Sequence, residues 1–255
     1  MREIILSWED IHQGSLILIN KTYPLKQLNL KSALIPANMN FPHIEMEMKA
    51  ASLLSHLLQD IGGNEDIIPV SGYRSLEEQQ SIYETSLIEN GEAFTHKYVA
   101  LPNHSEHQTG LAIDLAKKQE DIDFIRPEFP YEGICNVFRS RAADYGFVER
   151  YQKGKEEITG IAHEPWHFRY VGYPHSKHMK DMDLSLEEYI EYLKTFPKEG
   201  SHLKLRHRGQ YTEVFYIGLV KRRYMRISLC EHDIVQLSGN NVDGVIVTIW
   251  RKENE

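Results

Sequence analysis

The chain has 255 residues, of which 41% are hydrophobic and 26% charged, and its formal net charge is −8. These values are near the globular average, which excludes a disordered chain or a coiled coil as the main state. The negative charge argues against a broad nucleic-acid-binding surface. No segment approaches the ~20 apolar residues of a membrane span, and residues 1–14 lack the features of a signal peptide. We therefore expect a cytoplasmic protein with no nucleic-acid partner and no membrane span.

Hydrophobic spacing and turn residues predict a mixture of helices and strands. Residues 1–43 are typical of short strands and turns. Ser75 and Glu78 have the spacing of a capping box, which predicts a helix that starts at residue 76. In chain order we expect a helix at 44–61, a strand at 67–70, a helix at 76–89, a long irregular loop and candidate lid at 92–109, a strand at 111–115, a helix at 134–145, a strand at 166–171 and a helix at 185–194.

The composition changes after Pro197 and Gly200. Residues 203–250 contain runs of Val, Ile, Tyr and Leu separated by turn signals, which is typical of a β-rich region. Helices and strands do not alternate regularly before this point, which favours an α+β fold over a doubly wound sheet. We expect a catalytic domain at residues 1–196, with a small mixed or antiparallel sheet flanked by helices, and a β-rich C-terminal appendage of open role at 197–255.

The first segment that contains candidate metal-ligating residues runs from Ser105 to Asp114, with the sequence SEHQTGLAID. In a strand over 111–115, Ala112 and Asp114 share one face and the leucines and isoleucine share the other. An aspartate in the middle of a half-buried strand is costly unless it is paired or bound to a metal. Gly110 allows a sharp turn that can bring His107 back over the strand.

The second such segment is HEPWHFRY, residues 163–170. In a strand, Trp166, Phe168 and Tyr170 face one way and His167 faces the other. We expect Glu164 to precede that strand, in a turn that Pro165 fixes. The same letters also match the zincin motif H-E-x-x-H, which would make His163 a ligand. That motif requires a helix, and Pro165 would break it.

Together the two segments offer two histidines and one carboxylate, His107, Asp114 and His167, which is a typical catalytic zinc set with a fourth position for water. Zinc lowers the pKa of such a water to about 7 and polarises a carbonyl group. Glu164 is then placed to act as the base that transfers a proton to the leaving amine. We expect one zinc ion per chain.

These residues resemble a known family. The pattern S-x-H-x-x-G-x-A-x-D at 105–114, followed by E-x-W-H at 164–167, is similar to the zinc D,D-peptidases of the VanY type. The segment SGYRS at 71–75 with Gln79 resembles the substrate-binding arginine motif of the same family. The similarity runs from about residue 44 to 193. Within the family, the chain resembles most the cytoplasmic, bifunctional VanXY enzymes of glycopeptide-resistant enterococci.

The resemblance implies a function and a role for each residue. It implies hydrolysis of D-Ala-D-Ala and removal of the terminal D-Ala from peptidoglycan-precursor pentapeptide. His107, Asp114 and His167 match the zinc ligands, Glu164 the base, and Arg74 the group that stabilises the oxyanion and orients the substrate. Ser105 and Gln79 match positions that hold the substrate's terminal carboxylate. The backbone carbonyl of Trp166 matches the group that receives the dipeptide's ammonium.

Two other functions stay open. The same zinc set would serve an L,D-carboxypeptidase or endopeptidase that acts on cell-wall peptides. A non-catalytic protein that binds cell-wall peptides would keep the fold, although it would have no need of Glu164 as a base. Among the remaining residues, we expect Cys135 and Cys230 to be buried thiols and His175 and His178 to lie at the surface.

Overall fold

The computed structural model describes residues 1–26, 34–207 and 210–252. The chain folds into two compact units: residues 19–185, here the larger unit, and residues 1–18 together with 186–255, here the smaller unit. The division differs from the predicted boundary at residue 196. The final predicted helix and the N-terminal 18 residues both belong with the β-rich part.

The larger unit is built on a four-stranded antiparallel sheet with the order β4-β5-β7-β6. A two-stranded antiparallel pair, β2-β3, lies beside it in the same unit. The strands are β2 (Leu34–Pro36), β3 (Glu45–Glu47), β4 (Ile67–Ser71), β5 (Ala112–Lys117), β6 (Phe147–Tyr151) and β7 (Glu164–Tyr170). The helices are α1 (Met48–Asp60), α2 (Leu76–Asn90), α3 (Glu92–Tyr98), α4 (Gly133–Arg141), α5 (Glu156–Thr159) and α6 (His175–Met182), with 3₁₀ turns η2 (Glu106–Thr109) and η3 (Ala142–Tyr145).

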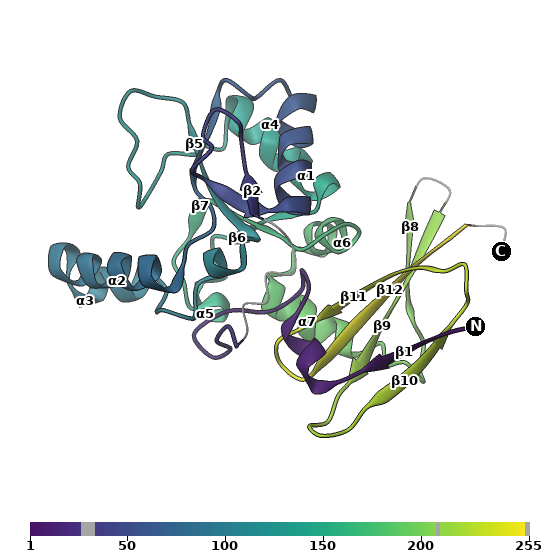
Figure 1. Cartoon of the computed structure of the whole chain (residues 1–255). Coiled ribbons are helices and arrows are strands. Elements are labelled where there is room, and N and C mark those ends of the chain that lie inside the picture. The colour runs from purple at the N-terminus through teal and green to yellow at the C-terminus, as the bar shows by residue number, and fades with distance from the viewer. Residues whose placement is uncertain (27–33, 208–209, 253–255) are drawn as a thin grey trace. The chain divides into compact units, whose positions relative to one another are not determined.

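Helices α1 and α4 cover one face of the central sheet (Figure 1). The reason is the apolar stripe of α1, whose Leu54 and Leu57 pack with Ile113 of β5 and Phe168 of β7 in one buried cluster. Because side chains alternate along a strand, Asp114 and His167 emerge on the opposite face. The hydrophobic core therefore fixes the face on which the polar residues gather.

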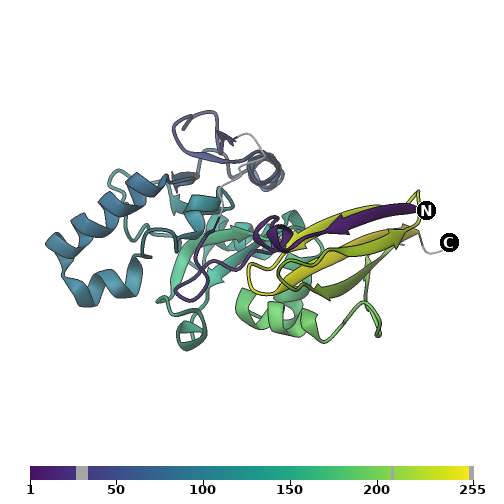
Figure 2. The same ribbon diagram turned by 60° about the horizontal axis from the view of Figure 1, so that its bottom comes forward.

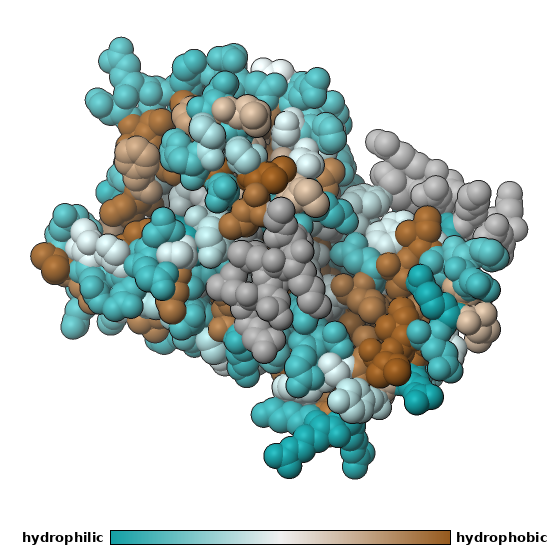
Figure 3. Space-filling view, in the orientation of Figure 1, coloured by the Kyte–Doolittle hydropathy of each residue, from teal (hydrophilic) through white to brown (hydrophobic). Residues whose placement is uncertain are grey.

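Helices α2 and α3 pack together at one end of the larger unit (Figures 1 and 2). The capping box of α2 is confirmed, since Ser75 Oγ accepts from the Glu78 N–H and Glu78 accepts from the Ser75 N–H. Only Gln79 and Ser86 of this helix are buried, and hydrophilic side chains cover most of its visible face (Figure 3). The prediction of an irregular loop over 92–109 is wrong, because α3 and η2 occupy much of it.

The smaller unit is mainly β-structure, as predicted. A four-stranded antiparallel sheet has the order β11-β12-β9-β8, and a separate pair joins β1 to β10. Its elements are β1 (Arg2–Leu6), η1 (Trp8–His12), α7 (Leu186–Lys194), β8 (Leu203–His207), β9 (Gln210–Gly218), β10 (Met225–Leu229), β11 (Ile234–Gly239) and β12 (Gly244–Lys252). The predicted α+β class with a β-rich C-terminal part is confirmed.

The predictions for four further residues have mixed outcomes. Cys135 is buried as expected, but Cys230 is exposed because it lies in a surface turn after β10, where its N–H is bound by Asp233. His175 was expected at the surface and is only 1% exposed. It occupies the first turn of α6, a turn fixed against η3 by the bond from Ser176 Oγ to the Ala143 carbonyl. His178 is partly buried.

Candidate metal centre and active-site cavity

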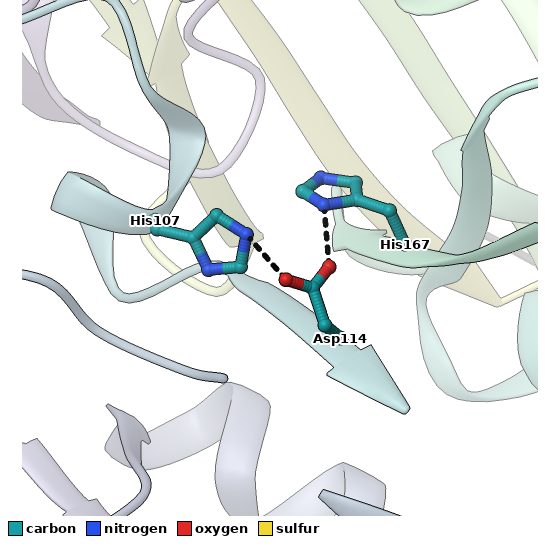
Figure 4. Close-up of side chains that lie close together, drawn as sticks. All are labelled: His107, Asp114 and His167. Carbon is teal, nitrogen blue, oxygen red and sulfur yellow. Dashed lines mark hydrogen bonds and ion pairs between the residues drawn. The ribbon is translucent and has the colours of Figure 1, made fainter. Parts of the chain in front are cut away.

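Three buried side chains, His107, Asp114 and His167, meet on the polar face of the central sheet (Figure 4). They come from η2, β5 and β7, and one donor atom from each lies within 4.8 Å of the others. Asp114 and His167 are opposite each other in the β5–β7 register. Gly110, in the left-handed region with φ +70°, ends η2 so that His107 can reach the same place.

The Asp114 carboxylate lies between the two imidazoles. Its Oδ2 is 3.1 Å from His107 Nε2 and its Oδ1 is 2.9 Å from His167 Nδ1. These imidazoles, together with nearby hydrogen bonds, outweigh burial and hold the pKa of Asp114 far below its ordinary value. Two imidazole nitrogens and one carboxylate oxygen, buried and converging, fit a divalent metal such as zinc.

A backbone carbonyl orients His107. Its Nδ1 is 2.7 Å from the Gly72 oxygen, which can only accept a hydrogen bond, so Nδ1 carries the hydrogen. Nε2 is then the nitrogen that can bind a metal. Gly72 itself lies where the backbone of β3 passes very close: a Cβ there would be 2.2 Å from the Glu45 carbonyl oxygen. Close packing against β3 thus explains the glycine of the SGYRS segment.

On the other side of His167 lies Glu106, a residue that the sequence motifs did not predict. The Nε2 of His167 faces Oε2 of Glu106 at 3.5 Å. The Oε1 of Glu106 is 2.8 Å from Arg150 Nε and 2.8 Å from Arg169 Nη1. The only sequence signal for Glu106 was its place next to His107.

Glu164 lies beside the three candidate metal ligands His107, Asp114 and His167, here called the donor group. Its position corrects a prediction. It is the first residue of β7 rather than part of a preceding turn. The β6–β7 register shifts between Glu149 and Tyr151, so the strict alternation of β7 is interrupted near Pro165. Glu164 Oε2 is then 3.9 Å from His167 Nδ1. Burial raises the pKa of the Glu164 carboxyl to about 8, in the range that suits proton transfer near neutral pH.

Arg74 is held by three polar groups. Its Nε donates to Ser71 Oγ at 2.8 Å, and its Nη2 is 3.1 Å from Asp114 Oδ2. Gln79 accepts from Nη1 at 3.4 Å and donates its own amide to the Ala100 carbonyl. The structure therefore places Gln79 behind Arg74, where it is fully buried.

A cavity of about 350 Å³ opens over these residues. Every predicted site residue except Gln79 lines it, including Ser105 and Trp166. The cavity continues along α2 to Glu89 and is bounded by Phe124 and Ile125. The donor group, the Glu164 carboxyl with its raised pKa and the anchored guanidinium of Arg74 thus line one cavity.

His163 has no place in this group. The segment 164–170 is a strand, and the Nε2 of His163 lies 2.7 Å from the Tyr131 hydroxyl, away from the metal-ligand candidates. The rejection of a zincin helix agrees with this geometry.

Arg139 is a further residue that binds next to Glu164. It donates to Glu149 Oε2 at 2.6 Å and to the Pro165 carbonyl at 2.8 Å. Arg139, which no sequence motif predicted, thereby fixes the peptide between Pro165 and Trp166.

Comparison with known proteins agrees with the geometry. A family model described as VanY, D-alanyl-D-alanine carboxypeptidase, matches residues 43–173. The bifunctional D-Ala-D-Ala dipeptidase and D-Ala-D-Ala carboxypeptidase VanXYC of Enterococcus gallinarum is 45% identical over 181 residues, which cover 71% of this chain and 95% of that relative.

Two solved structures extend the comparison. The vancomycin-resistance D,D-dipeptidase VanXYg, in complex with a D-Ala-D-Ala phosphinate analogue, is 52% identical, with a TM-score of 0.94 and coverage of 98% of this chain and 99% of that one. A mutant of the D,D-pentapeptidase VanY from a VanB-type resistance cassette, in complex with Zn(II), is 28% identical, with a TM-score of 0.56 and coverage of 70% and 99%.

Fold, donor set and comparisons together define a hydrolase of the metallopeptidase class. The chain belongs to the VanY family of D-alanyl-D-alanine carboxypeptidases, and the predicted similarity to its VanXY members is confirmed. Within the described residues, no helix has both the length and the apolar character needed to cross a bilayer.

Proposed function

We propose that the chain is a zinc-dependent D,D-peptidase that hydrolyses D-Ala-D-Ala and removes the terminal D-Ala from peptidoglycan-precursor pentapeptide. The observation that carries this proposal is the convergence of His107, Asp114 and His167 beside Glu164 and Arg74 in one cavity. The dipeptidase and carboxypeptidase activities of the VanXYC relative and the dipeptidase activity of the VanXYg relative support it. The catalytic work then belongs to the larger unit, which contains all of these residues.

The zinc ion would be held by His107 Nε2, a carboxylate oxygen of Asp114 and His167 Nδ1, one ion per chain. When bound, zinc supplies a water of lowered pKa and polarises the scissile carbonyl. The donor types and their burial suit this ion, and the zinc-bound VanY relative supports the choice.

Glu164 moves the proton. Its carboxylate accepts a proton from the attacking water and donates it to the amine that leaves as D-Ala. Burial stabilises the protonated form of the carboxyl, so the proton is held in the cavity between the two steps. Arg139 binds the Pro165 carbonyl and so fixes the backbone next to Glu164, which keeps the Glu164 carboxyl beside the donor group.

Arg74 and its neighbours bind and orient the substrate. Peptide hydrolysis builds negative charge on the carbonyl oxygen, and a guanidinium anchored by Ser71 and Gln79 can meet that charge without reorganising. Ser105, which lines the cavity, contributes to the binding of the substrate's terminal carboxylate. Gln79 acts on the substrate through Arg74. The Trp166 carbonyl receives the ammonium of the dipeptide.

Two kinds of substrate are compatible with the shape of the cavity. A dipeptide needs only the part near the metal ligands, whereas the extension along α2 leaves room for the N-terminal residues of a longer peptide. In the cytoplasm, this activity would remove precursors that end in D-Ala-D-Ala, which are the target of vancomycin, so that altered precursors replace them.

The test is a panel of three substrates given to the zinc-loaded full chain. We expect D-Ala release from D-Ala-D-Ala and from a pentapeptide ending in D-Ala-D-Ala. A tetrapeptide ending in L-Lys-D-Ala should release less than one hundredth as much. Release from the tetrapeptide alone would reassign the chain as an L,D-carboxypeptidase. Binding of all three peptides without release from any would make it a peptide-binding protein.

A further inference from the structure

A buried cluster of charges lies on the side of His167 that faces away from Asp114. Glu106 is enclosed by Arg150 and Arg169, and all three side chains have 0% exposure. Both guanidinium groups bind the same oxygen, Oε1, at 2.8 Å. Two positive charges beside one carboxylate keep Glu106 ionised. Such a cluster contributes little to the free energy of folding, because the cost of desolvating three charges offsets their mutual attraction.

The other oxygen of Glu106 has a different neighbour. Oε2 lies 3.5 Å from His167 Nε2, and neither atom has a hydrogen-bond partner in the part of the chain that the structure describes. Buried polar atoms without a partner are rare in folded proteins. A small rotation of the imidazole brings the pair into hydrogen-bonding range, and the carboxylate oxygen can only accept.

We infer that Glu106 is a positioning residue that holds the hydrogen of His167 on Nε2, so that Nδ1 is the atom offered to the metal. The two histidines are then fixed in opposite ways. His107 donates from Nδ1 to the Gly72 carbonyl and offers Nε2, whereas His167 donates from Nε2 to Glu106 and offers Nδ1. Outer partners of this kind orient metal-binding histidines. The inference rests on the metal site of the proposed function.

The substitution Glu106→Gln tests the inference. The two guanidinium groups would hold the carbonyl oxygen of the new side chain, which leaves its NH₂ group against the Nε2–H of His167. We expect the dissociation constant for Zn²⁺, measured by competition with a chelator, to rise about 10- to 100-fold. The matched control is Glu213→Gln, since Glu213 also contacts a histidine, His202 at 2.6 Å, and an arginine, Arg251 at 3.0 Å, but no metal ligand. Its zinc affinity should stay within twofold of the parent.

A second measurement needs no variant and covers the case in which Glu106→Gln does not fold. In ¹⁵N-histidine-labelled, zinc-loaded parent protein, long-range ¹H–¹⁵N spectra should show the hydrogen of His167 on Nε2 and that of His107 on Nδ1. A hydrogen on Nδ1 of His167 would overturn the inference, as would a Glu106→Gln variant with parental zinc affinity. A parent protein that does not bind zinc would instead overturn the proposed function.

Discussion

At the scale of single residues, Glu164 allows metal binding and turnover to be tested separately. It contributes no atom to the donor group, yet it lies 3.9 Å from His167 and faces the cavity. We predict that Glu164→Ala lowers kcat for D-Ala release about 10²- to 10⁴-fold, because the proton carrier is lost, while the bound zinc stays at one equivalent. Kinetics and metal analysis on the same sample check this.

The control for that variant is Glu84→Ala, on the exposed side of α2, where Glu84 accepts a hydrogen bond from the Gln80 amide. It should keep parental kcat. Parental turnover by Glu164→Ala would show that the proton takes another route, and loss of zinc from it would show that Glu164 is a ligand.

Arg74 is a second residue that can be tested, because its guanidinium makes contacts that a lysine of the same charge could not make. Its fork reaches Ser71, Gln79 and Asp114 at once, which an ammonium on a flexible stem cannot reproduce. We predict that Arg74→Lys lowers kcat/KM about 10²-fold, with most of the effect in kcat if the guanidinium meets the developing oxyanion. Steady-state kinetics on D-Ala-D-Ala would measure it, and a value within threefold of the parent would remove Arg74 from the mechanism.

At the scale of elements, the end of β4 is fixed by the close passage of β3. A Cβ on Gly72 would lie 2.2 Å from the Glu45 oxygen, so Gly72→Ala must push the two strands apart. The same shift would move the carbonyl that orients His107. We predict a loss of about 1–3 kcal/mol in the free energy of unfolding and weaker zinc binding by about 10-fold.

The control for Gly72→Ala is Gly63→Ala, where the atoms nearest to an added Cβ belong to the side chains of Ile61 and Ile67, at 3.2 Å or more. It should keep parental zinc affinity. Urea unfolding and chelator competition measure the two quantities. Unchanged zinc affinity in Gly72→Ala would show that the backbone around Gly72 does not orient His107.

The elements that sequence patterns predicted well are those whose apolar stripe packs on the core. The pattern of α1 predicted a helix over its whole observed length, although its start was placed at residue 44 where β3 precedes it. The strand of Asp114 and that of His167 followed from alternation. The short helices α3 and η2 were missed because they are brief and polar, and such turns are held by local hydrogen bonds rather than by an apolar face.

The same reasoning explains which site residues were predictable. His107, Asp114, His167, Glu164 and Arg74 stand in two short motifs and one strand end, so their spacing carried the prediction. Glu106 and Arg139 depend on partners far along the chain, Arg150 for the former and Pro165 for the latter. No local spacing encodes such contacts, and only the assembled sheet brings them together.

At the scale of the whole molecule, the division into units could not be deduced from composition. β1 pairs with β10, so the first residues of the chain complete a sheet formed by residues more than two hundred positions later. The predicted boundary after residue 196 followed the change in composition at Pro197. The helix before it, α7, nevertheless belongs to the smaller unit.

The stability of the chain should depend on pH through His175. Burial lowers the pKa of this imidazole to about 3, so the folded chain holds it neutral. The unfolded chain, with a pKa near 6.5, binds the proton first as the pH falls, so stability is full above about pH 6.5 and is lost below it. We predict that lowering the pH from 7.5 to 5 costs the parent about 2 kcal/mol more of unfolding free energy than it costs His175→Asn.

Urea unfolding at the two pH values checks that prediction. The exposed histidine of α1 supplies the control, because His56→Asn should keep the parental loss. An identical pH dependence in the parent and in His175→Asn would mean that the buried imidazole is protonated in the folded chain.

The central claim is that one zinc ion, held by His107, Asp114 and His167, makes this chain a D,D-peptidase. The most direct test is to remove metal from the full chain with a chelator, add Zn²⁺ stepwise, and follow D-Ala release from D-Ala-D-Ala. We predict no release without metal and a linear return that saturates at one equivalent of zinc per chain. Release that survives chelation, or a zinc-loaded and folded chain that releases no D-Ala, would contradict it.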